Sequence, residues 1–398
     1  MKAVRSFRDT FQPDSSYRAF LLCILITGLS AGLYKGILDN YLAEVINMSE
    51  MDRGITEFFR EMTGILLVFV LAACYMLSAE TLFQSGALII LLGLGMHAVI
   101  PPGRILTILA ISIVAMGEHI QLGMKSTLSL QYAKDGRGGT AQGIQNSVGQ
   151  IGTLMGLLAV FCAFTIADGK QLYRAFFAFA AILSAAACIA SVKMRGNSPT
   201  DKSPCRFYFH RKFRKYYMLE MFYGARKQVF LTFGPYVLIL FYGAETATVS
   251  LLFAISAVAC FIAAPLVGRI IDRIGFKTVM VMDTLILVAV CLLYGFSHHI
   301  FPKHVAFIVC CVNYVLDAVI SLASMASNIY VQALSDSPDE TKATISTGVS
   351  VNHIITIFIA LFGGWIWQSL GIETLFMVSA SLGLLNSAYA ATIRTSPR

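Results

Sequence analysis

The chain has 398 residues, of which 57% are hydrophobic and only 13% are charged, and its mean hydropathy is +0.72. A soluble domain carries about 25% charged residues, so this composition excludes an ordinary water-soluble protein and indicates a polytopic membrane protein. The formal net charge of +8 then bears on membrane orientation and anionic lipid rather than on a nucleic-acid partner.

The nine cysteines favour neither a disulfide scaffold nor a metal or redox site. All but Cys205 lie within apolar runs, and no CxxC motif occurs. The polar residues before the first apolar run also argue against a cleavable signal peptide. We therefore expect small buried thiols, no bound metal and no cofactor.

Twelve apolar runs are long enough to cross a bilayer as helices, which requires about 20 residues each. They predict an all-α integral membrane fold with twelve transmembrane helices in two pseudo-symmetric six-helix bundles. The predicted helices lie near 17–45, 55–77, 80–100, 103–133, 143–167, 172–194, 215–243, 246–270, 277–297, 305–334, 344–370 and 372–393.

The first two predicted helices carry charged residues inside the membrane. Lys35 and Asp39 are four residues apart, so they share one helix face with each other and can pair. The second helix opens with an outer charge network. Two interpretations stay open for both groups: an outer gate or proton site, and a static set of salt bridges between the helices. The outer network consists of Glu57, Arg60 and Glu61.

The fourth and fifth predicted helices have different characters. Glu118 and Lys125 lie on a polar face of the fourth helix, with Glu118 near the expected midplane. Because an ionisable side chain in the membrane is costly, this pair is predicted to face a cavity and to take part in proton coupling or solute binding. The fifth helix carries Gly149, Gly152 and Gly156, which predict close helix packing.

A basic stretch separates the sixth predicted helix from the seventh. Residues 195–215 contain seven Lys or Arg, opposed only by Asp201. We interpret it as a cytoplasmic linker. The predicted domains are therefore an N-terminal bundle (1–194), a linker (195–214) and a C-terminal bundle (215–398). With both termini in the cytoplasm, most Lys and Arg of the loops fall on the cytoplasmic side, as the positive-inside rule requires.

The seventh predicted helix places Arg226 and Lys227 well inside the membrane. Two adjacent cations there require carboxylates or an anionic solute as partners. The sequence offers Asp317 and Glu118 as those partners. Gly234 and Pro235 further along are expected to weaken or kink this helix.

The segment after the eighth predicted helix reads GRIIDRIGFK and resembles the cytoplasmic loop signature of the major facilitator superfamily. The corresponding loop of the first half, MLSAETLFQSG, lacks the Asp-Arg pair. Other segments, such as YKGILDNYLAE, look like those of uncharacterised bacterial members of this family. The resemblance implies an alternating-access transporter in the bacterial cytoplasmic membrane, with a conformational latch or a simple topogenic turn at this loop. The motif residues are Gly268, Asp272, Arg273, Gly275 and Lys277.

The tenth predicted helix repeats the pattern of the fourth. Asp317 lies near the expected midplane, about level with Glu118 of the other half. It belongs to a polar stripe on one face, which consists of Asn313, Asp317, Ser321, Ser324 and Asn328. Two equivalent helices with central carboxylates predict a water-accessible cavity, whereas interhelical hydrogen bonding is the alternative. In the next helix, His353 is either a titrating group or a packed side chain.

These patterns predict a secondary active transporter and not an enzyme. The solute is expected to be small, organic and polar, anionic or zwitterionic, and its movement to be coupled to protons. A proton-driven multidrug efflux antiporter is the first alternative, and a non-transporting membrane sensor or enzyme is the second. The chain has no P-loop and no HExxH motif. We expect a monomer that contacts solute, protons and membrane lipids but no nucleic acid.

Overall fold

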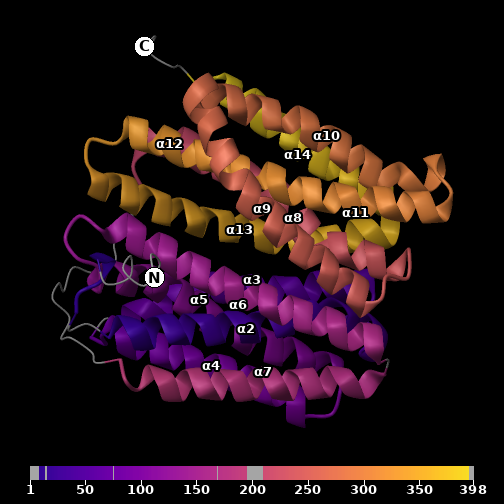
Figure 1. The fold of residues 1–398 in the computed structure, drawn as a ribbon. Helices are drawn as coiled ribbons and strands as arrows, with labels where there is room; N and C mark the ends of the chain where they lie inside the picture. Colours follow the sequence, from indigo (N-terminus) through magenta and orange to yellow (C-terminus); the bar gives the residue numbers. More distant parts are fainter. Residues whose placement is uncertain (1–8, 14–15, 75, 168, 195–208, 394–398) are drawn as a thin grey trace. The chain divides into compact units, whose positions relative to one another are not determined.

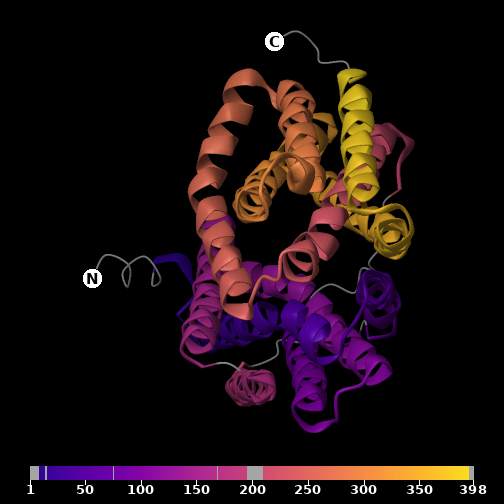
Figure 2. The same cartoon turned by 90° about the vertical axis from the view of Figure 1, so that its right-hand side faces the viewer.

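The computed structural model describes residues 9–393 apart from 14–15, 75, 168 and 195–208. Long helices joined by short connections make up these residues (Figures 1 and 2). They form two compact units. The first comprises Met1–Ile46, Leu66–Cys205 and Thr246–Leu251, and the second Asn47–Ile65, Arg206–Glu245 and Leu252–Arg398. The proposed boundaries at 194 and 215 therefore remain predictions.

The first unit is built on five long helices. They are α2 (Tyr17–Asn40), which continues as a π-helical segment over Tyr41–Val45, α4 (Ala79–Val99), α5 (Arg104–Gln131), α6 (Gly138–Ile166) and α7 (Lys170–Ser191). Helix α2 packs against α6 and α7, and α4 packs against α5 and α7. The last turns of α3 and the first turn of α9 also belong to this unit.

The second unit contains the first turns of α3 and the helices that follow residue 209. They are α3 (Glu50–Ala73), the short 3₁₀ segment Arg211–Phe213, α8 (Arg214–Leu240), α9 (Thr246–Ile274), α10 (Phe276–Ile300), α11 (Lys303–Ile320), α12 (Met325–Leu334), α13 (Pro338–Leu370) and α14 (Ile372–Ala391). Helix α14, yellow in Figure 2, packs against α10, α8 and α13.

Ten helical segments among the described residues are long and apolar enough to cross a membrane. Helices α3 and α8 are not among them, because they carry the charged residues that the sequence analysis placed inside the bilayer. The number of twelve transmembrane helices and the cytoplasmic location of the termini remain predictions. The helix bounds themselves agree with the predicted runs to within six residues.

The helix predicted over 305–334 is not continuous, and this corrects the sequence interpretation. A 3₁₀ turn at Ser321–Ser324, called η3, separates α11 from α12. The carbonyl of Ser321 accepts hydrogen bonds from Ser324 Oγ (2.9 Å) and from the Tyr223 hydroxyl of α8 (2.8 Å). Side chains that bond to backbone carbonyls in this way compete with the regular α-helical pattern.

The described end of the basic stretch packs onto the second unit. Phe213 is fully buried in a core cluster, and Lys212 forms salt bridges with Asp336 (2.7 Å) and Glu340 (3.4 Å). These two carboxylates raise the pKa of Lys212. The remainder of the predicted linker, residues 195–208, lies outside the described residues.

The cysteines of the apolar runs match the expected buried thiols only in part. Cys23, Cys291 and Cys310 are buried, whereas Cys162 on α6 is exposed on the surface of the protein. An exposed thiol on an apolar helix is compatible with a surface that faces lipid, so hydropathy alone does not distinguish it from a buried one.

Glycines hold α2 and α6 together, as the sequence predicted for the fifth helix. A Cβ atom on Gly156 would lie 2.5 Å from the carbonyl oxygen of Leu29, and one on Gly28 would lie 2.5 Å from that of Gly149. The two backbones therefore approach each other as closely as small residues permit.

Gly156→Ala is expected to destabilise the protein by about 1–3 kcal/mol, because the added methyl group meets backbone atoms that cannot move aside. The matched control is Gly143→Ala on the same helix, where a Cβ meets nothing within 4 Å. There alanine should be neutral or stabilising by up to about 1 kcal/mol, since it favours the helix. Thermal unfolding in detergent measures both, and equal shifts for the two variants would contradict the packing argument.

Candidate functional site

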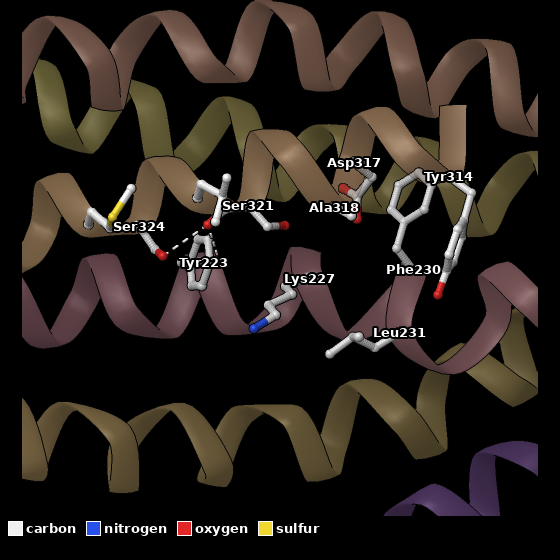
Figure 3. Close-up of a pocket in the computed structure, with 11 residues that line it drawn as sticks. Tyr223, Lys227, Phe230, Leu231, Tyr314, Asp317, Ala318, Ser321 and Ser324 are labelled. Carbon is white, nitrogen blue, oxygen red and sulfur yellow. Dashed lines mark hydrogen bonds between the residues drawn. The ribbon is translucent and has the colours of Figure 1, made fainter. Parts of the chain in front are cut away.

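A pocket of about 330 Å³ lies within the second unit, between α8 and the α11–η3–α12 segment (Figure 3). Its wall combines two ionisable side chains, hydroxyl groups and aromatic rings. The lining residues are Tyr223, Lys227, Phe230, Leu231, Tyr314, Asp317, Ala318, Ser321, Leu322, Ser324 and Met325. A volume of this order is the lower end of what small-molecule sites offer.

Asp317, predicted as a cavity residue, lies on the wall of this pocket. Its side chain comes from α11, only 7% of the residue is exposed, and Oδ1 has no hydrogen-bond partner among the described residues. The positive charges of Arg226 and Lys227 act on it electrostatically. Because a buried carboxylate without a hydrogen bond is costly, this group is available to a proton or a solute.

Lys227 lines the same pocket from α8 (Figure 3). Its ammonium nitrogen lies 5.7 Å from the centre of the Tyr223 ring, a cation–π contact. Within the described part of the chain, no carboxylate forms a salt bridge with it. The pocket thus contains one cation and one carboxylate that are not paired directly with each other.

Arg226 is fully buried, and its direct partner differs from the two expected from the sequence. Its Nη2 donates to Asp283 Oδ2 of α10 at 3.0 Å, and its guanidinium lies 4.9 Å from the centre of the Tyr223 ring. Asp317 interacts with Arg226 only electrostatically. Asp283 was not predicted as a partner of Arg226. The available signal was that Asp283 is the only acidic residue of the ninth predicted helix.

A second, water-sized cavity of about 20 Å³ adjoins the pocket and shares Tyr223 and Ser324 with it. Glu220, Asp283 and Asn386 are among its polar lining residues. Ser327 donates a hydrogen bond of 2.8 Å to Glu220 Oε1. This cavity extends the polar interior from the pocket toward α10 and α14.

The residues of the polar stripe predicted on the tenth helix have different surroundings in the structure. Asn313 is buried, and its Nδ2 donates to the carbonyl of Val309 one turn earlier, so its amide is satisfied within α11. Ser321 and Ser324 line the pocket, whereas Asn328 at the end of the predicted stripe is exposed. Of the predicted stripe residues described, Asp317 and Ser321 therefore have unused hydrogen-bonding capacity, and only Asp317 of the two is a carboxylate.

The predicted outer charge network is present in the second unit as a set of ion pairs on α3. Arg60 Nη2 bonds Glu57 Oε1 (2.5 Å) and Glu61 Oε1 (2.9 Å). The remaining members were not predicted from the sequence. Arg53 bonds Glu57 at 2.9 Å, Gln228 donates to Glu57 at 2.9 Å, and Glu61 contacts His353 and Thr356, each at 2.9 Å. His353 is therefore joined to the network by its contact with Glu61.

The outer charge network is buried and closely packed within the second unit. Glu57 is only 1% exposed and receives bonds from two arginines and Gln228. Gly54 and Gly64 bring α3 close to α13, because a Cβ on Gly54 would lie 2.5 Å from the carbonyl oxygen of Ala360. The choice between gate and static salt bridges remains open.

The other predicted charges belong to the first unit. Lys35 is exposed and Asp39 is 8% exposed on α2. Glu118 and Lys125 are both half-buried on α5, and the Glu118 carboxylate interacts electrostatically with Lys125. The roles of these four residues remain predictions.

The loop motif forms the junction of α9 and α10. Gly275 has a φ of 86°, a conformation that glycine adopts readily, so it explains the tight turn. Lys277 Nζ donates to the carbonyl of Ile393 at 2.8 Å.

Asp272 and Arg273 of the loop motif are exposed, and neither forms a side-chain hydrogen bond or ion pair with a described residue. Apart from its chain neighbours and the backbone of its own helix, no described atom lies within 4 Å of a Cβ built on Gly268. The latch role stays a prediction.

Several solved transporter structures are similar to this chain. The nucleoside transporter NupG has a TM-score of 0.74 at 16% identity, covering 94% of this chain and 98% of that chain. The peptide transporter POT in complex with sulfate has a TM-score of 0.71 at 13% identity, and the match covers 94% of each chain. The D-xylose–proton symporter has a TM-score of 0.72 at 14% identity, and the match covers 95% of this chain and 98% of that chain. At these identities the likeness shows the fold alone.

A search of curated protein sequences finds no match. The family model of the Major Facilitator Superfamily, by contrast, matches residues 20–344 and 216–398. These matches extend over nearly the whole chain, and the helical architecture agrees with them. The chain therefore belongs to the major facilitator superfamily and is a membrane transporter, not an enzyme.

Proposed function

We propose that this protein moves a small anionic or zwitterionic organic solute by alternating access, coupled to protons. The observation that supports the proposal is the pocket wall on which Asp317 and Lys227 lie without a salt-bridge partner among the described residues. Holding two unpaired charged groups in a membrane protein is costly. A solute with an anionic group compensates Lys227, and a proton or an ammonium group compensates Asp317.

Proton coupling follows from the same arrangement. A carboxylate that is alternately neutralised by a proton and by a cationic neighbour changes the electrostatic balance of the pocket in each half of the cycle. Asp317 has Arg226 and Lys227 as cationic neighbours. Glu118 beside Lys125 offers a second such pair in the first unit.

The proposed membrane arrangement keeps the earlier boundaries. Two six-helix bundles, 1–194 and 215–398, are joined by a cytoplasmic linker at 195–214, with both termini in the cytoplasm. The protein acts as a monomer in the bacterial cytoplasmic membrane.

Multidrug efflux is the second candidate, and the aromatic wall of the pocket favours it. Tyr223, Phe230 and Tyr314 give a surface on which flat apolar cations can stack. The two candidate functions differ in how the positive charge of Lys227 acts on the transported molecule. An anionic solute needs that cation, whereas a cationic drug is repelled by it. Lys227→Met should therefore weaken transport in the first case and leave or improve it in the second.

Proteoliposomes that contain the purified protein test the proposed function. A panel of amino acids, short peptides, organic acids, sugars, nucleosides and cationic dyes is first screened by thermal shift, because a bound ligand stabilises the protein. We expect an anionic or zwitterionic member to raise the Tm and to accumulate in the vesicles when a pH gradient is imposed. Collapse of the gradient should abolish accumulation. Accumulation that persists without any gradient, or movement of cationic dyes alone, would contradict the proposal.

A further inference from the structure

Two histidines and one glutamate converge at the end of α10, and none of the three lines the pocket described above. His298 Nε2 lies 3.0 Å from Glu373 Oε1, and His299 Nε2 lies 2.8 Å from the same oxygen. The three ligand atoms all lie within 4.8 Å of one another. We propose that His298, His299 and Glu373 form a binding site for one divalent transition-metal ion of the Zn²⁺ type.

The convergence of the two imidazoles is unusual for neighbours in sequence. Consecutive residues of a helix point about 100° apart, yet the ring centres of His298 and His299 lie only 3.9 Å apart. Both ring nitrogens are directed at one carboxylate oxygen. If both rings were protonated, a single carboxylate would face two adjacent positive charges. A divalent ion instead satisfies two neutral imidazoles and an ionised carboxylate together.

The distances suit the metal after small adjustments. Zinc bonds imidazole nitrogen and carboxylate oxygen at about 2.0–2.2 Å, so the donors of a tetrahedral site lie about 3.3 Å apart. The two observed Nε2 to Oε1 distances are a few tenths of an ångström shorter. Two imidazoles and one carboxylate leave a fourth position for water. This donor set favours Zn²⁺, Ni²⁺ or Cu²⁺ over Mg²⁺ and Ca²⁺, which prefer oxygen ligands.

The backbone around the cluster holds the ligands in place. The histidines lie in the last turn of α10, where the helix dipole favours a cation. Glu373 lies in the first turn of α14, and Gly371 before it has a φ of 91°. A Cβ on Gly371 would lie 2.7 Å from Glu373 Oε2, so glycine leaves the room that the carboxylate occupies. A bound ion would join the end of α10 to the beginning of α14.

The affinity is expected to be modest. His298 Nδ1 is enclosed without a hydrogen-bond partner among the residues described. Metal-binding histidines usually donate that second ring N–H to an acceptor, and losing such a contact weakens binding about 10–100-fold. His299 is 58% exposed at its side chain, so the ion can enter from solvent.

The test uses the full-length protein in detergent, purified without a polyhistidine tag and treated with a chelator. Zn²⁺ is titrated by calorimetry, and Co²⁺ serves as a visible-absorption probe of the ligand geometry. We expect one Zn²⁺ per chain, a rise in Tm with Zn²⁺ and none with Mg²⁺ or Ca²⁺ at equal concentration.

Three variants and one control locate the site. His298→Ala, His299→Ala and Glu373→Gln should each weaken Zn²⁺ binding at least tenfold and remove the Co²⁺ absorption. His304→Ala, an exposed histidine near the beginning of α11, should bind as the wild type does. His299 is exposed, so its variant keeps the fold and remains informative if the others do not. No binding by the wild type, or equal binding by His299→Ala and the wild type, would overturn the proposal.

Discussion

Asp317→Asn is expected to abolish proton-driven accumulation of the solute while solute exchange across the membrane continues. The amide has nearly the same shape as the carboxylic acid, so the pocket keeps its volume, but it cannot take up or release a proton. Asp317 is suited to this role because its Oδ1 is enclosed without a hydrogen bond in the described structure and because Arg226 and Lys227 act on its charge. Uptake with and without a pH gradient, compared with counterflow in the same proteoliposomes, measures the two activities separately.

Glu118→Gln is expected to behave in the same way if the first unit takes part in coupling. The matched control is Asp336→Asn, which removes a carboxylate whose side chain is 89% exposed and which pairs with Lys212 outside the pocket. That variant should accumulate solute as the wild type does. If Asp317→Asn and Glu118→Gln both retain the pH dependence of the wild type, the coupling assignment is wrong.

Arg226→Met is expected to destabilise the protein strongly, by about 3–5 kcal/mol, because it leaves the Asp283 carboxylate buried without its cation. The guanidinium has no exposed surface and lies 3.0 Å from Asp283. Asp283→Asn should also be destabilising, since it leaves the arginine charge uncompensated apart from Asp317. Thermal unfolding in detergent should show a fall in Tm for each variant.

The double variant Arg226→Met/Asp283→Leu tests whether the single variants lose stability because one charge of the pair is left without its partner. Replacing both members of a buried pair by apolar residues is often close to neutral, so the double variant should unfold at a higher temperature than either single variant. Arg273→Met serves as the control, because Arg273 is exposed and forms no ion pair with a described residue. Additive losses in the double variant would show that the two residues do not stabilise each other.

The helices of this chain could be predicted from the sequence because the bilayer imposes their length and their apolar character. The Glu57–Arg60 contact was also predictable, since residues three apart on one helix are neighbours on its surface. The contact of Arg60 with the adjacent Glu61 does not follow from that spacing. The glycines of the fifth predicted helix indicated close packing, and the structure identifies α2 as the helix that α6 approaches. The loop motif led to the family, which the family model confirms.

Contacts between distant helices were not predictable in the same way. Arg226 and Asp283 are 57 residues apart, and their pairing depends on how α8 and α10 are rotated about their own axes. A change of one position in the helix register turns a side chain by about 100°, so composition alone cannot select Asp283 over Asp317. The break at η3 likewise depends on the Tyr223 hydroxyl of another helix.

The His298, His299 and Glu373 cluster illustrates the same limit. The sequence predicted no metal, because its ligands form no local motif and Glu373 is 74 residues from His299. Hydropathy and short motifs are local properties, so the amino-acid sequence alone was enough to identify a membrane protein with an apolar helical fold and the family to which it belongs. The pairing of the charged side chains, the lining of the pocket and the convergence of ligands at the end of α10 came from the folded structure, because they depend on how the helices pack.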